Sequence, residues 1–337
     1  MKKKNIILSA SFLILTMIIT FYVIFSKHSF NEIKVGLLNL DYLYIFISIL
    51  LIFLYFLIQG IYTKVIFKTL GTKYSLLKGA YYGGVEFLFS GITPSSSGGQ
   101  PMVIYHMKKE GIPIKQSSIV MLIGVIFFKL FLVIGAIAIL IFKPEYIIEA
   151  NTLIKVCFIL GALLDIFLTI FYGLLLYNQK VLKVLFTLVY KVYYKLFKKD
   201  GDYNLKANAV LAQYSQESKF IKNNKKCILI SLLLVFLQRL IMFSIVYVIY
   251  KGLGLSGMSY IEMVLLQIFV QISVEPIFIP GATGISEYVS GNMFITMFGV
   301  LSTTGMLLFR LLTFYIPIFF IAFIYLIVSL LKIKKKI

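Results

Sequence analysis

Long apolar segments alternate along the chain with short polar segments that are rich in lysine. A membrane-spanning helix needs about 20 apolar residues, because it crosses roughly 30 Å of hydrocarbon at about 1.5 Å per residue. The pattern predicts an all-α polytopic membrane protein. The segments that reach this length without an internal break are residues 5–25, 42–61, 116–142, 156–177, 227–250 and 303–331.

Two further apolar segments, residues 75–111 and 259–300, are interrupted near the middle by proline and glycine. A broken helix exposes backbone N–H and C=O groups that lipid cannot satisfy, so the break needs protein or water around it. Each segment is therefore a re-entrant hairpin or a pair of short spans, with an ordinary kinked span as the alternative. The first break holds Thr93, Pro94, Gly98, Gly99 and Gln100, and the second holds Pro280, Gly281 and Gly284, followed by Glu287.

The lysines decide the topology. Their clusters fall on one side of the membrane only if each interrupted segment enters and leaves by the same face, and the positive-inside rule makes that side the cytoplasm. We expect six full spans and two re-entrant hairpins of opposite orientation, in one transmembrane domain of the cell membrane covering residues 1–337. Both termini and the basic loop 178–226 are predicted to be cytoplasmic. The lysine clusters lie at residues 2–4, 64–78, 108–115, 180–226 and 332–336.

Composition agrees with this placement in lipid. Hydrophobic residues make up 60% of the chain, and the mean hydropathy is +0.97, which is unusual for a soluble protein. A net charge of +20 raises nucleic-acid binding as a rival function, but the lysines lie at the ends of spans, so we expect no nucleic-acid partner. The N-terminal apolar run is too long for a secretory signal, which predicts a retained first span.

The basic loop 178–226 begins with a helical pattern. Leu182, Leu185, Val189, Val192 and Leu196 recur at spacings of three and four, with lysines on the other faces. This pattern predicts a helix lying on an anionic leaflet, while a solvated linker whose lysines fix the topology fits equally well.

Arginine is rare in this chain and lies inside the membrane. Lysine and arginine total 33, yet Arg239 and Arg310 are the two arginines, and both fall within apolar spans. A guanidinium stays charged and binds phosphate in bidentate fashion, so contact with a lipid phosphate is one interpretation. A structural pair with a carboxylate is the other.

Carboxylates flank both breaks. Glu86 precedes the first break, and Glu275 and Glu287 bracket the second. Such groups have three alternative roles: to neutralise the arginines in the empty state, to contact a cationic head group, or to carry protons. We expect Glu275 and Glu287 to be the partners of the arginines when no lipid is bound. Lys129 and Asp165 occupy the midpoints of consecutive spans and predict a structural ion pair.

The two breaks resemble the signatures of a known family. Paired interruptions in inverted halves of a transporter point to a binding site at the repeat interface. The motifs are similar to those of the lysylphosphatidylglycerol synthase transmembrane region, also called the YbhN-like family, and the resemblance covers nearly the whole chain. The matching residues are Thr93-Pro94, Gly98-Gly99-Gln100-Pro101, Tyr105, Lys109-Glu110-Gly111-Ile112, Pro280-Gly281-x-x-Gly284-x-x-Glu287 and Arg310-x-x-x-x-Tyr315-x-Pro317.

The resemblance implies a lipid translocase. Members fused to an aminoacyltransferase domain form the multiple peptide resistance factor, which links the family to antibiotic resistance, makes lysyl-phosphatidylglycerol from charged tRNA and moves it to the outer leaflet. We expect no such domain in this chain, and we therefore expect movement of an anionic or aminoacylated phospholipid, or of a lipid-linked head group. The alternatives are a phosphatidylglycerol lysyltransferase-family protein and a membrane accessory subunit of a separate lipid synthase.

The expected partner is a membrane phospholipid, with a separate lipid synthase as a further candidate. No acyl-transfer constellation occurs, which argues against the transferase alternative, and no Gly-rich nucleotide motif occurs, so we expect no direct use of ATP. We expect no cofactor and no metal. The predicted translocation site comprises Glu86, Thr93, Pro94, Gly98, Gly99, Gln100, Arg239, Glu275, Pro280, Gly281, Gly284, Glu287 and Arg310.

Overall fold

The computed structural model describes residues 38, 40–93, 96–196, 208, 211–212, 219, 222–276 and 285–334. Its described elements are helices, and no strand occurs among them. The predicted first span, residues 5–25, lies outside this part of the chain. The helices are α3 (Tyr42–Thr69), α4 (Leu76–Gly91), α5 (Gly99–Lys109), α6 (Ile114–Phe142), α7 (Glu145–Ile148), α8 (Thr152–Tyr177), α9 (Gln179–Leu196), α11 (Lys225–Gly252), α12 (Tyr260–Val274), α13 (Ile285–Phe298), η3 (Gly299–Leu301), α14 (Ser302–Arg310), η4 (Leu311–Tyr315) and α15 (Ile316–Lys334).

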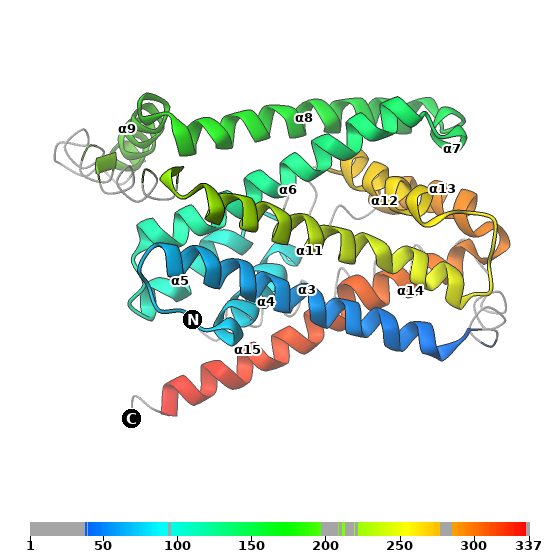
Figure 1. Ribbon diagram of the computed structural model, residues 1–337, viewed down its shortest axis with the longest axis horizontal. Helices are drawn as coiled ribbons and strands as arrows, with labels where there is room; N and C mark the ends of the chain where they lie inside the picture. The colour runs from blue at the N-terminus through cyan, green and yellow to red at the C-terminus, as the bar shows by residue number, and fades with distance from the viewer. Residues whose placement is uncertain are drawn as a thin grey trace.

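Long apolar helices form the body of the protein. Helices α3, α6, α8 and α11 are each long and apolar enough to cross a membrane, and the chain from Tyr288 to Ser329 forms a fifth such stretch. They run along the long axis of the molecule in Figure 1. Large apolar side chains such as Leu163 and Phe167 are exposed on their outer faces, where lipid replaces water. The prediction of an all-α, multi-pass membrane protein is confirmed.

Both interrupted segments form hairpins of two short helices. Helices α4 and α5 lie toward the left end of the molecule, and α12 and α13 toward the right end (Figure 1). Helix α4 has 16 residues and α12 has 15, which gives roughly 24 Å at helical rise and falls short of the roughly 30 Å hydrocarbon core. The two hairpins enter from opposite ends, as the inverted-repeat prediction requires.

The connections at the two ends are held by polar contacts. Where α4 and α5 open, Lys78 Nζ lies 3.1 Å from Glu110 Oε2 and closes the mouth of the first hairpin. At the opposite end, the N–H of Asp41 donates to the carbonyl of Gly252 (3.0 Å), which joins the start of α3 to the end of α11. The ends of α3, α5 and α15 and the start of α11 lie at the first-hairpin end (Figure 1), so the described lysine clusters gather on one side.

Each hairpin packs into its own apolar core. The core around α4 and α5 includes Tyr82, Val85 and Met107, and the core around α12 and α13 includes Phe269 and Phe294. Where such side chains leave water, burial stabilises each half by about 25 cal/mol per Å² of apolar surface. Where they leave lipid, the stabilisation comes from close packing of the helices.

The last span is not a regular helix. Between α14 and α15, residues Leu311–Tyr315 form a π-helical turn directly after Arg310. Pro317 explains the irregularity, because its ring displaces the carbonyl one turn earlier and it has no N–H to donate. Such π-turns in α-helices often accompany functional sites.

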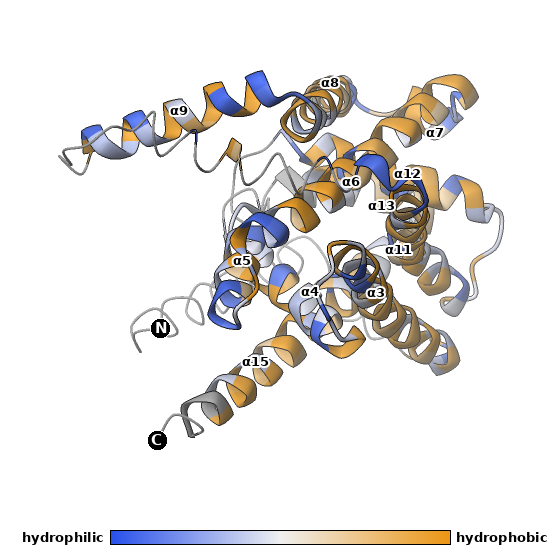
Figure 2. Cartoon of the chain, turned by 60° about the vertical axis from the view of Figure 1, so that its left-hand side comes forward, coloured by the Kyte–Doolittle hydropathy of each residue, from blue (hydrophilic) through white to orange (hydrophobic). Residues whose placement is uncertain are grey.

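Helix α9 projects away from the bundle, as Figure 2 shows. Of the predicted apolar stripe, Leu182 is buried against the bundle, whereas Val189, Val192 and Leu196 are exposed. The predicted helix is therefore confirmed.

Candidate functional site

A cavity of about 370 Å³ lies among the helices, and both broken hairpins line it. The polar residues that the first hairpin contributes are Glu86, Ser90, Ser96 and Gln100, and the second contributes Gln267, Gln271 and Ser290. Helices of both hairpins therefore reach one polar cavity, whereas the second break, at which a binding site between the two breaks was expected, lies outside the described residues. Pro94, Pro280, Gly281 and Gly284 lie outside them.

Both arginines line this cavity. Arg239 comes from the middle of α11, and its guanidinium carbon lies 3.9 Å from the centroid of the Phe128 ring, a close cation–π contact. Its Nη1 donates to the hydroxyl of Tyr55 (3.4 Å), but its buried Nε has no hydrogen-bond partner among the described residues. Arg310 reaches the cavity from the last turn of α14, beside the π-turn. An acceptor that entered the cavity would satisfy the free donor of Arg239.

Side-chain amides hold Glu86 in place. Gln59 Nε2 donates to Glu86 Oε2 (3.3 Å), and Gln100 Nε2 donates to Glu86 Oε1 (3.1 Å). Gln238 Nε2 in turn donates to Gln59 Oε1 (2.9 Å). The network joins α3, α4, α5 and α11, so the carboxylate has a fixed position in the cavity wall.

Gln59 and Gln238 line the cavity but are not among the predicted site residues. Gln59 has no part in the predicted site, although a lone amide within an apolar span is a signal that could have identified it. Gln238, next to Arg239, has the same character.

The turn of the first hairpin has a structural role that differs from the prediction. Thr93 Oγ1 accepts from the N–H of Gly98 (2.8 Å) and donates to the carbonyl of Phe89 (2.7 Å). The N–H of Gly98 is thus used within the turn and is not a free donor for a ligand. Gly99 starts α5 where a Cβ would lie 2.6 Å from the carbonyl oxygen of Glu86, so glycine permits the close approach of α5 to α4.

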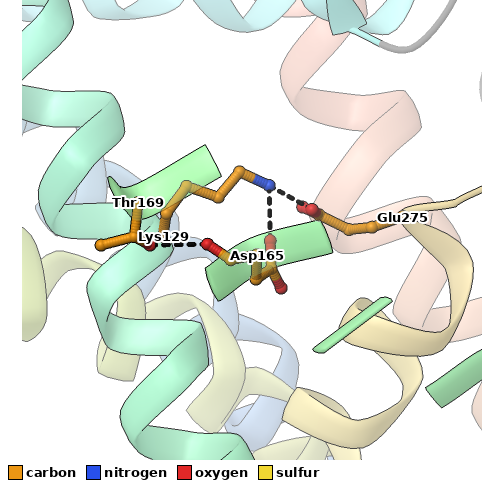
Figure 3. Close-up of polar contacts among 4 residues, drawn as sticks. All are labelled: Lys129, Asp165, Thr169 and Glu275. Carbon is orange, nitrogen blue, oxygen red and sulfur yellow. Dashed lines mark hydrogen bonds and ion pairs between the residues drawn. The ribbon is translucent and has the colours of Figure 1, made fainter. Parts of the chain in front are cut away.

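Glu275 does not face the arginines, which corrects the prediction. Its carboxylate accepts a hydrogen bond from Lys129 Nζ, and the same ammonium lies 2.9 Å from Asp165 Oδ1 (Figure 3). The predicted pair of Lys129 and Asp165 is present, with Glu275 as an unpredicted third member. Helix α12 packs against α6 and α8, and this packing directs Glu275 toward them and not toward the cavity. The side chain of Glu287 is not described.

The cavity combines groups that suit an amphipathic, charged ligand. Two guanidinium groups, one carboxylate and several amides share walls with Phe87, Phe128 and Phe314. Its volume lies in the lower part of the range of small-molecule sites, so it has room for a head group and not for a pair of long acyl chains. No group of three or more histidine, cysteine or acidic residues that could hold a metal occurs in the described part of the chain.

A family model described as the lysylphosphatidylglycerol synthase TM region matches residues 6–321. No curated protein and no solved structure matched the chain.

Proposed function

Because the chain belongs to the lysylphosphatidylglycerol synthase TM region family, we propose that this membrane protein is a lipid translocase that moves an anionic or aminoacylated phospholipid between leaflets. One observation carries the proposal: two broken hairpins of opposite orientation line one polar cavity into which both arginines face. A route for a polar head group needs such a site, because lipid cannot satisfy the charges that cross it.

The arginines bind the lipid phosphate in this proposal. A guanidinium forms two parallel hydrogen bonds with a phosphate and keeps its charge in a low-dielectric site. The unpaired Nε of Arg239 supplies one such donor, and Arg310 lines the same cavity. The acyl chains remain in the surrounding lipid while the head group occupies the cavity.

Glu86 selects the remainder of the head group. The amides of Gln59 and Gln100 fix its carboxylate, which faces the cavity together with Arg239. A carboxylate beside a phosphate-binding arginine favours a head group that carries both an anionic phosphate and an ammonium with N–H groups that donate to the carboxylate, which the quaternary ammonium of phosphatidylcholine lacks. An aminoacylated phospholipid has this pair of charges, and phosphatidylglycerol has the phosphate alone.

The orientation proposed for the protein follows from its lysines. The described lysine clusters lie at the end where the first hairpin opens, and the positive-inside rule assigns that end to the cytoplasm of a cell membrane. The first hairpin then faces the cytoplasmic leaflet, where phospholipids are made, and the second faces the outer leaflet.

Reconstitution in proteoliposomes tests the proposal. Head-group-labelled phosphatidylglycerol, lysyl-phosphatidylglycerol and phosphatidylcholine are placed in the vesicles, and an impermeant quencher reports the share of each lipid in the outer leaflet. We expect faster exchange of the first two lipids than in protein-free vesicles, with phosphatidylcholine unchanged. Exchange of none of them would refute the translocase and favour an accessory subunit, while lysyl transfer from charged tRNA by the pure chain would favour a transferase.

A further inference from the structure

Three charged side chains from three helices meet away from the cavity wall. Lys129 of α6 lies between Asp165 of α8 and Glu275 at the end of α12, and Figure 3 shows both carboxylates directed at its ammonium group. Asp165 is fully buried, and Lys129 and the side chain of Glu275 are about nine-tenths buried. The cluster lies at the start of the second break, where α12 ends.

Close packing holds α12 against both partner helices. Gly161 of α8 allows the carbonyl of Ile272 to approach so closely that a Cβ would lie 1.9 Å from its oxygen. One turn away in α8, Phe158 stacks on Phe269 of α12 with ring centroids 4.7 Å apart. These contacts bring the carboxylates of Asp165 and Glu275 to the same ammonium group.

The charges and hydrogen bonds of the cluster do not balance. With all three groups ionised, one positive charge faces two negative charges, and a surplus charge inside a membrane protein is strongly unfavourable. The second oxygen of Asp165, Oδ2, is buried and has no hydrogen-bond partner among the described residues. Of the charged side chains described on α6, α8, α11 and α12, those that face the cluster are its own three and, behind the ring of Phe128, Arg239.

We propose that the cluster of Lys129, Asp165 and Glu275 binds one proton, which is carried together with the anionic lipid; this inference rests on the proposed translocase function. The proton binds to a carboxylate oxygen, with Asp165 Oδ2 as the free position, and makes the cluster neutral. A proton needs one lone pair, whereas a hard metal cation needs about six or more oxygen ligands.

Phe128 connects the proton site to the cavity. Lys129 Nζ lies 5.6 Å from the centroid of its ring and the guanidinium carbon of Arg239 lies 3.9 Å from it, so the two cations are within about 10 Å of each other. A phosphate that neutralises Arg239 removes a nearby positive charge that opposes proton uptake. At an effective dielectric constant of about 20, this interaction shifts proton binding by about one pH unit. Anion and proton therefore favour each other's binding.

Infrared spectroscopy tests the proton site without any transport assay. The purified protein in nanodiscs is titrated while the carboxylic-acid C=O stretch is recorded in H₂O and in D₂O. We expect a band that changes with pH and is lost in both Asp165→Asn and Glu275→Gln, because either change leaves one carboxylate for one ammonium. Glu262→Gln is the matched control on α12, since glutamine keeps its capping interaction with Ser259. A band that persists in all variants would overturn the proton site, and so would the absence of any band in the wild-type protein. A band whose intensity depends on the Na⁺ concentration and not on pH would overturn it too.

Transport measurements test the coupling separately. In proteoliposomes with a pH gradient, the wild-type protein should move labelled phosphatidylglycerol in the direction in which protons move down the gradient. In Asp165→Asn, translocation should no longer depend on the gradient, while the lipid still equilibrates between the leaflets. Wild-type translocation that is indifferent to the gradient overturns the coupling and leaves the translocase intact. A titrating band with no translocation of any lipid overturns the translocase instead.

Discussion

Replacing Lys129 with methionine removes the positive charge of the buried cluster and should destabilise the protein strongly. The variant leaves Asp165 and Glu275 as two buried carboxyl groups with no cation between them. Breaking a buried ion pair in this way typically costs about 3–5 kcal/mol, because the remaining charge has no compensation.

The proton balance sets the size of this effect. One proton already neutralises the wild-type cluster in our proposal, so the variant must take up a second one. Protonating a carboxyl group with an ordinary pKa of about 4 costs about 4 kcal/mol at pH 7 and about 1.4 kcal/mol at pH 5. On folding, the wild-type protein takes up one proton at this cluster and the variant takes up two. A fall in pH therefore stabilises the folded variant more than the folded wild type, so the destabilisation should shrink as pH falls.

Unfolding of the detergent-purified protein measures this difference. The free energy of unfolding, or the thermal midpoint of the monodisperse fraction, is compared between wild type and Lys129→Met at pH 7 and pH 5. Lys64→Met is the control, because Lys64 is exposed on α3 and its loss should change stability by about 0.5 kcal/mol or less. An effect of Lys129→Met that is equal at the two pH values, or no larger than the control, would refute the charge balance.

Two further predictions concern packing and topology. Gly161→Ala should reduce the yield of folded protein, because its Cβ would lie 1.9 Å from the carbonyl oxygen of Ile272. Gly173→Ala on the same helix has open space and should be tolerated. Size-exclusion profiles of the two variants would show the difference, and equal profiles would contradict the prediction. A cysteine at Lys143 should react with an impermeant reagent in intact cells, and one at Lys183 should not, in a background without native cysteines; the reverse pattern would invert the proposed orientation.

The hairpins were predictable because their signals are local. Proline and glycine interrupt residues 75–111 and 259–300, so the length and the break of each segment could be predicted from short stretches of sequence. Lysines flank the first segment directly, and the clusters at residues 180–226 and 332–336 on either side of the second segment gave its direction. The arginines of the cavity were predictable for a related reason: a charge within an apolar span needs a polar environment, and the breaks are where such an environment forms.

Apart from the pair of Lys129 and Asp165, the partners of the charges were not predictable. Glu275 lies 146 residues from Lys129 in the chain, and their contact depends on α12 packing against α8 at Gly161. No pattern of residues in either segment predicts that α12 and α8 lie so close together. The amides around Glu86 came from α3, α5 and α11 for the same reason, since donors from separate helices meet only when the helices have packed.

The phosphate-binding role of the two arginines is tested most directly by translocation per folded molecule in Arg239→Lys and Arg310→Lys. Lysine keeps the positive charge but lacks the planar pair of donors, so each variant should fold while its rate of anionic-lipid translocation falls about tenfold, equivalent to about 1.4 kcal/mol. Rates are normalised to the monodisperse protein recovered from the same proteoliposomes. Wild-type rates in both variants would contradict the role that we assign to Arg239 and Arg310.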